Sequence, residues 1–311
     1  MPLITSLTNP RVAALRALQS AKGRAEADAF LVEGPHLLDA ALDAGVAPLV
    51  ALYAPETLER TPTGRALLGR LAVARDDGTE VLEATPEVVA RACDTQTPQG
   101  VVASVARDMV APDRVRQRRR GRARPLVLLL DALSDPGNVG TLLRTALAAD
   151  VDEVWLTEGA TDWLAPKVVR AVSGAHFHLP VRAGLTWDDI ALRAGGAPRV
   201  RQVLLAEASG AVAYDTLDLT ERTVVIAGNE AHGPSRQAAA LATARVSIPM
   251  WNGVESLNAA IAASVILFEG ARQRRAHQRD GAPSIASDPS EQPAETERVD
   301  DPGAQRGTAT D

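Results

Sequence analysis

One apolar run, residues 126–130, constrains the fold of this 311-residue chain more than any other feature. Its sequence, Leu-Val-Leu-Leu-Leu, has no polar position, which is the pattern of a strand buried on both faces in a parallel sheet. Glycine-containing loops follow this run and several later ones. The order predicts a mostly parallel α/β sheet with a binding site at the carboxyl edge of its strands. Further strands are expected at 154–156, 177–181, 203–206, 224–227 and 246–248, and helices at 139–149 and 167–172.

Residues 1–107 show a similar alternation and are predicted to form a separate, small α/β domain. Strands are expected at 29–32, 49–53 and 101–105. Asn9-Pro10 and Thr85-Pro86 are typical helix starts, and a third helix is expected over 36–44.

Two charged segments complete the predicted organisation. Residues 108–125 contain seven arginines and no apolar periodicity, so they are interpreted as a linker between the first domain and a second one at 126–275. The linker is either a solvated hinge or a contact for RNA or phosphate. Residues 276–311 carry eight acids against three arginines, which accounts for −5 of the net charge of −6. Their composition predicts a disordered acidic tail.

Several classes of protein are excluded by composition. Cys93 is the only cysteine, so neither a disulfide framework nor a cysteine-rich zinc site is possible. The first sixteen residues lack the apolar core of a signal peptide. The longest apolar stretch, 259–268, is far shorter than the roughly 20 residues that cross a bilayer. A cytoplasmic protein without a membrane partner is therefore expected.

Three loops carry candidate chemistry. The first, 131–140, follows the opening strand and places Asn138 six residues before Arg144, nearly two helical turns apart. It lacks the G-x-G-x-x-G pattern of a dinucleotide site and the Gly-Lys-Ser/Thr of a phosphate-binding loop. The second, 226–235, contains Gly228, which permits close approach of a ligand to the backbone, and the carboxylate Glu230.

The third loop, 248–258, reads Ile-Pro-Met-Trp-Asn-Gly-Val-Glu-Ser-Leu-Asn and runs into the apolar stretch 259–268. Ser256 is expected to cap the following helix or to lie close to the cap. The unpaired N–H groups and partial positive charge of a first helical turn suit an electron-rich ligand. Taken singly, each loop is equally well explained as an ordinary turn or a capped helix.

The ordered set of three is more specific. N-x-G-x-x-x-R at 138–144, G-N-E-x-x-G-P-S at 228–235 and I-P-M followed by E-S-L-N at 248–258 resemble the signature motifs of SpoU-type (TrmH-like) RNA ribose 2′-O-methyltransferases of the SPOUT superfamily. The resemblance covers about 126–274. Residues 30–36, Phe-Leu-Val-Glu-Gly-Pro-His, and Gln99-Gly100-Val101 are similar to the family's N-terminal substrate-binding domain.

The resemblance implies an α/β fold with a deep trefoil knot in the second domain, which general rules of chain topology would not predict. It also implies a homodimer that binds S-adenosyl-L-methionine and methylates a ribose 2′-hydroxyl in structured RNA. The two-domain architecture favours 23S ribosomal RNA as substrate. The cofactor residues implied are Gly228, Ile248, Leu257, Ala206 and Met250, and the polar catalytic residues are Arg144, Asn138, Glu230, Ser256 and Asn258.

The role of Arg144 follows from its chemistry. Because a guanidinium is not deprotonated in proteins, Arg144 is a poor proton acceptor. Our hypothesis is that it clamps the phosphate next to the target ribose, while Asn138, Ser256 and Asn258 orient the ribose and Glu230 fixes the loops. The proton would then go to that phosphate or to water.

Three alternatives remain open at this point: a transfer-RNA 2′-O-methyltransferase, a non-catalytic RNA-binding member of the same fold, and an enzyme that acts on a base nitrogen. The histidines do not suggest a metal site. His176 and His178 alternate at the start of an expected strand, so they would point to one face, without a cysteine or acidic cluster nearby. His36 and His232 are candidates for RNA contact.

Overall fold

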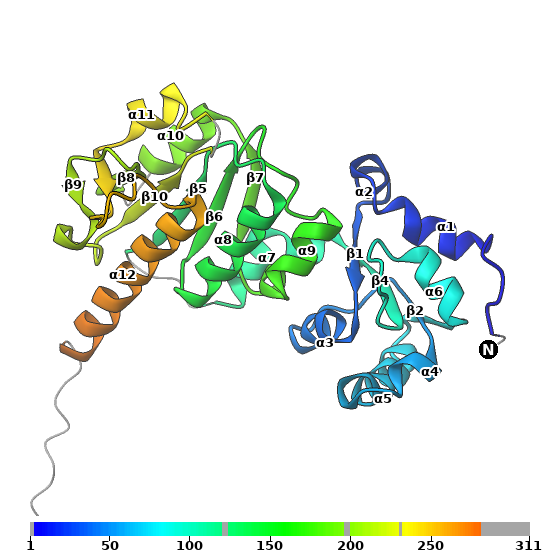
Figure 1. Cartoon of the computed structure of the whole chain (residues 1–311). Helices are drawn as coiled ribbons and strands as arrows, with labels where there is room; N and C mark the ends of the chain where they lie inside the picture. Colours follow the sequence, from blue (N-terminus) through cyan, green and yellow to red (C-terminus); the bar gives the residue numbers. More distant parts are fainter. Residues whose placement is uncertain (1–2, 120–123, 196–199, 230–231, 281–311) are drawn as a thin grey trace, which may run out of the picture.

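The computed structural model describes residues 3–119, 124–195, 200–229 and 232–280, which form two α/β domains (Figure 1). The N-terminal domain has a four-stranded sheet in the order β1-β4-β2-β3. β4 is antiparallel to both of its neighbours, and β2 and β3 are parallel. The strands are β1 (Ala29–Glu33), β2 (Val50–Tyr53), β3 (Glu80–Glu83) and β4 (Val101–Ala106).

Helices cover both faces of this small sheet. They are α1 (Pro10–Ala17), α2 (Ala21–Ala27), α3 (Pro35–Asp43), α4 (Pro55–Leu58), α5 (Pro62–Asp76) and α6 (Pro86–Ala92). Proline begins five of the six, at a position where its missing N–H has no helical partner to lose.

The second domain has a seven-stranded sheet in which all recorded strand pairs are parallel. The strand order is β7-β6-β5-β10-β8-β11-β9. The predicted mostly parallel α/β sheet is therefore confirmed. The strands are β5 (Leu126–Leu130), β6 (Glu153–Thr157), β7 (Val181–Leu185), β8 (Gln202–Ala206), β9 (Val212–Ala213), β10 (Thr223–Ala227) and β11 (Ala244–Ser247).

The apolar side chains of β5 pack against the helices on both faces of the sheet. Leu128 and Leu130 belong to the core under α8 (Pro136–Ala148), α9 (Pro166–Val172) and α12 (Ala259–Asp280). Val127 and Leu129 pack on the opposite face, where α10 (Trp187–Gly195) and α11 (Arg236–Leu241) lie (Figure 1). Every residue of β5 is buried, as the absence of a polar position predicts.

The two domains meet where α9 and the segment after it pack against β1. The Arg24 side chain is almost completely buried and pairs with Asp162 at 2.5 Å. Arg170 pairs with Glu33 at 3.4 Å and Asp94 at 2.9 Å. An apolar core cluster includes residues from both domains, so their relative orientation is fixed by packing as well as by charge.

The arginine-rich segment 108–125 is more structured than its sequence indicates. It contains part of a 3₁₀ turn (Arg107–Val110) and α7 (Pro112–Gln117), anchored by the buried Val115. Arg116 pairs with Glu153 and Arg119 with Asp150, both at 2.7 Å. These two arginines therefore bind the second domain, which corrects the view of this segment as a free hinge. Arg120 and Arg122 lie outside the described residues.

The strand expected at 177–181 is wrong. Residues Ala175–Phe177 form a 3₁₀ turn, and β7 begins only at Val181. Gly174 introduces a left-handed turn at φ 91°, and Pro180 restricts the residue before it, so the ladder starts after the proline. His176 is consequently buried in the core, with 1% of its surface exposed.

The C-terminal helix also differs from expectation. α12 extends to Asp280, five residues past the expected domain end at 275, and the rest of the acidic tail lies outside the described residues. In the part of the chain that the structure describes, no helix is long and apolar enough to span a membrane.

Candidate active site

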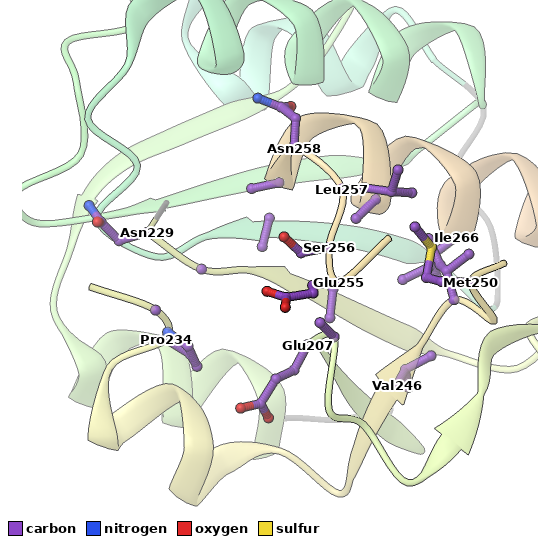
Figure 2. A pocket seen from close by; sticks show the side chains of 18 residues that line it. Glu207, Asn229, Pro234, Val246, Met250, Glu255, Ser256, Leu257, Asn258 and Ile266 are labelled. Carbon is purple, nitrogen blue, oxygen red and sulfur yellow. The ribbon is translucent and has the colours of Figure 1, made fainter. Parts of the chain in front are cut away.

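A cavity of about 520 Å³ opens where β8, β10 and β11 end, next to the first turns of α12 (Figure 2). Its position at the carboxyl edge of the sheet agrees with the sequence-based prediction. The ends of β8, β10 and β11 and the segments that directly follow them supply most of its wall, and α12 closes one side. The residues that line it are Ala206, Glu207, Ala208, Ala227, Gly228, Asn229, Gly233, Pro234, Val246, Ile248, Met250, Glu255, Ser256, Leu257, Asn258, Ala259, Ala262 and Ile266.

The first loop is held at the start of α8 by its cap. The Asp135 carboxylate accepts a hydrogen bond from the Asn138 N–H at 2.8 Å, and Pro136 occupies the first turn. This places Asn138 in the first helical turn. Its side-chain oxygen accepts a hydrogen bond from the Asn258 amide at 3.2 Å, which joins the first and third loops.

The second loop is tied to the first by two hydrogen bonds. The Asn229 amide donates to the carbonyl of Ala132 at 2.7 Å, and the Ser235 N–H donates to the Asp131 carboxylate at 2.7 Å. A Cβ at position 228 would lie 3.0 Å from backbone atoms of Pro234, so this backbone would have to move by a few tenths of an ångström to accept a side chain. The glycine therefore lets the loop fold back on itself beside the cavity.

The third loop reaches the helix through a left-handed turn. Asn252 and Gly253 adopt φ values of 58° and 72°. The helix is capped by Asn258, whose side-chain oxygen accepts from the N–H groups of Ala260 at 2.9 Å and Ile261 at 3.2 Å. Asn258 rather than Ser256 is therefore the cap, since the helix begins at Ala259.

The structure brings together most of the predicted site residues. Gly228, Ile248, Leu257, Ala206 and Met250 all line the cavity, as do Ser256 and Asn258. Asn138 joins them through its hydrogen bond to Asn258. Arg144 lies on the exposed face of α8 and does not line the cavity, and Glu230 falls outside the described residues.

Sequence reasoning missed two acidic residues in the wall. Glu207 directly follows β8, and Glu255 precedes Ser256 in the third loop. The position of Glu207 at a strand end was the available signal for it, because parallel strand ends share one edge. Glu207 is partly buried and pairs with Arg245 at 3.0 Å.

The histidines in the described part of the chain do not belong to a group of metal ligands. No group of three or more potential metal ligands occurs among the described residues. His176 is buried against Trp163 with ring centroids 5.1 Å apart, and its Nε2 lies 2.9 Å from the Trp163 carbonyl oxygen. Burial lowers the pKa of His176 to about 4. It is therefore neutral at physiological pH and part of the core.

Both domains match known protein families. Residues 125–268 match the SpoU rRNA Methylase family, and residues 9–103 match the MRM3-like substrate binding domain. An uncharacterized tRNA/rRNA methyltransferase of Synechocystis is 34% identical over 89% of this chain and 96% of its own length. The chain belongs to the SpoU methylase family.

Further relatives of this family have named activities or bound ligands. The 23S rRNA (guanosine(2553)-2′-O)-methyltransferase of Bacillus subtilis is 30% identical over 86% of this chain and 98% of its own length. The solved structure of the SpoU methyltransferase AviRb from Streptomyces viridochromogenes, in complex with the cofactor AdoMet, is 30% identical with a TM-score of 0.71. It covers 86% of this chain and 100% of that one.

Proposed function

We propose that this protein transfers a methyl group from S-adenosyl-L-methionine to a ribose 2′-hydroxyl of structured RNA, with 23S ribosomal RNA as substrate. The observation that carries the proposal is the joining of the first and third loops by the Asn138–Asn258 hydrogen bond beside one cavity. Family membership and the 2′-O-methyltransferase relative support the reaction type. We also propose that the enzyme works in the cytoplasm, where a bacterial ribosomal RNA is found.

The residues around the cavity fit the cofactor. Its volume falls within the range typical of small-molecule sites. Val246, Ile248 and Ile266 offer apolar surface, while the close-packed backbone at Gly228 offers polar groups without a side chain in the way. When bound, S-adenosylmethionine supplies a methyl group on a positively charged sulfur, and transfer leaves a neutral thioether, a methylated ribose oxygen and one released proton.

The polar residues near the cavity suit the RNA side of the reaction. Asn258 and Asn138 are joined by a hydrogen bond, and we propose that this pair positions the ribose with the help of the Ser256 hydroxyl. Arg144 lies on the same helix as Asn138. We propose that it binds the phosphate beside that ribose, because a guanidinium can donate two hydrogen bonds to one phosphate. Glu230 is proposed to hold the second loop in place.

We propose that the N-terminal domain selects the RNA through a groove beside α3. Two adjoining hollows there share His36 and Gln99 in their walls. Arg170 lines one and Arg60 the other, so the groove offers two guanidinium groups beside other hydrogen-bonding groups. The charge of Arg170 is partly compensated by Glu33, which lines the same hollow, and by Asp94. The match to a substrate-binding domain model supports this assignment.

A homodimer is proposed from the exposed face of α12. Ile261 and Phe268 are 53% and 46% exposed, and they border a shallow hollow with Val265 and Tyr214. An apolar helix face of this kind next to a functional site is typical of an interface. We also propose that the second domain contains the trefoil knot of the superfamily, supported by family membership and by the convergence of the second and third loops.

The dimer is tested by Phe268→Glu, which should convert the protein to monomers in size-exclusion chromatography with light scattering. Leu192→Glu is the matched control, because Leu192 is 76% exposed on α10, away from this face. A Phe268→Glu protein that keeps the mass of the wild type would argue against an interface at α12.

The proposed reaction is tested by mapping 2′-O-methylated positions in total RNA from cells with and without the gene. One position in 23S ribosomal RNA should lose its methyl group when the gene is deleted and regain it on complementation. Loss at a transfer-RNA position instead would support the alternative substrate. If no position changes while purified protein still binds RNA, a non-catalytic RNA-binding protein is the better description.

A further inference from the structure

The charged side chains that line the cavity are all negative. Among the lining residues that the structure describes, Glu207 and Glu255 are acidic, and none is lysine, arginine or histidine. The other lining side chains are apolar or, at Asn229, Ser256 and Asn258, polar without charge, so no positive charge in the described wall compensates the two carboxylates. The cavity therefore favours a cation and disfavours an anion such as the RNA phosphate.

The two carboxylates differ in their surroundings. Glu207 is countered by Arg245 at 3.0 Å, so the pair is close to neutral when seen from the cavity. Glu255 lies on the exposed third loop, and no ion pair of its side chain is recorded within the described ranges. Figure 2 shows its carboxylate near Ser256, on the cavity side of the loop. Glu255 is thus the source of the uncompensated negative charge.

This charge matters because the methyl donor and its product differ by one positive charge. S-adenosylmethionine has a sulfonium sulfur, whereas S-adenosylhomocysteine has a neutral thioether and is otherwise the same molecule without one methyl group. An apolar cavity would distinguish the two only by the size of that methyl group. A nearby carboxylate distinguishes them by charge as well.

We propose that Glu255 makes the cavity selective for the cationic methyl donor over the neutral-sulfur product. The proposal rests on the proposed function, because it takes S-adenosylmethionine as the ligand. Glu255 thereby promotes release of the product and limits product inhibition. Since the residue is exposed, water screens its charge, and we expect a roughly threefold to tenfold contribution to the ratio of the two dissociation constants.

The test is isothermal titration calorimetry of each ligand with the wild type and with Glu255→Gln. Glutamine keeps the shape and hydrogen-bonding capacity of the side chain but removes its charge. In the variant, binding of S-adenosylmethionine should weaken roughly threefold to tenfold. Binding of S-adenosylhomocysteine should stay within about twofold, because its sulfur has no charge to lose.

Two controls separate charge from structure. Glu255→Asp keeps the charge and should retain most of the preference. The double variant Glu207→Gln/Arg245→Gln removes an ion pair without changing the net charge, so the ratio of dissociation constants should stay near that of the wild type.

Raising the salt concentration to about 1 M should reduce the preference of the wild type toward that of Glu255→Gln.

Other outcomes overturn the proposal in distinguishable ways. Equal weakening of both ligands in Glu255→Gln would mean that Glu255 only shapes the loop. An unchanged ratio would mean that its charge does not reach the sulfur. In both cases the proposed methyltransferase function would stand. If the wild type bound neither ligand, the proposed function would fail and this inference with it.

Discussion

At the scale of single residues, His176 is the clearest case of a side chain whose environment decides its chemistry. It stacks with Trp163 and with Phe30, one from each domain, and its Nδ1 is buried without a hydrogen-bond partner among the residues that the structure describes. Burial lowers its pKa from 6.5 to about 4, and only the Trp163 carbonyl and the charge of Asp162 act in the other direction. A charged imidazolium is therefore excluded from this position at neutral pH.

This predicts a pH-dependent stability. The unfolded chain binds a proton at His176 below about pH 6.5, whereas the folded protein does so only near pH 4, so stability is lost as pH falls through this window. The loss attributable to His176 is about 3 kcal/mol. Urea unfolding at pH 7 and pH 4.5 measures it, and His176→Phe should lose less stability than the wild type over that range. Equal losses in both proteins would assign the pH dependence to other groups.

Arg144 gives a second prediction at this scale. Arg144→Lys keeps the positive charge but loses the bidentate fork, so the single-turnover methylation rate should fall about tenfold or more. Because Arg144 does not line the cavity, the affinity for S-adenosylmethionine should be unchanged in the same protein. A lysine variant with nearly normal rate would contradict the bidentate role.

Residues that line the cavity could be predicted from the sequence where backbone pattern and motif agree. Gly228 and Met250 lie in short ordered motifs, and both line the cavity. His176 was misplaced because a local apolar run cannot show that Gly174 and Pro180 interrupt a strand. Its burial depends on Phe30, which is far away in the sequence.

At the scale of elements, the packing of α8 on α9 fixes the first loop. A Cβ at Gly140 would lie 2.4 Å from the Cβ of Ala171. The two helices approach this closely only because position 140 has no side chain. Asn138 and Arg144 are carried by the same helix, so their placement depends on this contact.

Gly140→Ala should therefore destabilise the protein by about 1–3 kcal/mol, since the helices must move apart. The matched control is Gly69→Ala in α5, where an added Cβ meets nothing within 4 Å. That substitution should be neutral or stabilise by up to about 1 kcal/mol through helix propensity. Chemical denaturation of the two variants compares them directly, and similar effects would show that the α8–α9 contact can relax.

Elements with a strong local signal were predicted and those without one were not. Pro10 and Pro86 correctly marked the starts of α1 and α6. α5 and α10 were missed, although both are amphipathic in the structure, because small and charged residues interrupt their apolar positions. The cap of α12 was placed two residues early, because Ser256 and Asn258 are both good capping residues and only the fold chooses between them.

At the scale of the whole molecule, Arg170 connects the two domains. It pairs with Glu33, whose side chain is 4% exposed and also accepts hydrogen bonds from the N–H groups of Asp94 and Thr95. The same arginine lines the groove proposed for RNA. One side chain thus contributes both to the domain interface and to the groove for which we propose RNA selection.

Arg170→Met should lower the free energy of unfolding by about 1–2 kcal/mol, a value reduced for solvent screening because the Arg170 side chain is 32% exposed. We also expect the unfolding transition in calorimetry to broaden or split, because the domains lose part of their coupling. Arg272→Met is the matched control, since the Arg272 side chain is exposed and its partner Glu269 lies in the same helix, α12. A single sharp transition at the wild-type temperature would show that apolar packing alone couples the domains.

The domain arrangement could not be predicted from the sequence. The pairs Arg24–Asp162 and Arg170–Glu33 join residues more than a hundred positions apart, and no local pattern distinguishes them from surface charges. The arginines at 116 and 119 illustrate the same limit, because their partners Glu153 and Asp150 belong to another domain.

The contribution of α12 to the cavity has a consequence for the order of events during synthesis. The lining residues at 206–208, 227–234 and 246–258 leave the ribosome before Ala259, Ala262 and Ile266, which supply the remaining wall. A nascent chain therefore has no complete donor site until its last helix has been made. A translation product that ended before α12 would carry the N-terminal domain, for which we propose RNA selection, without a complete cavity.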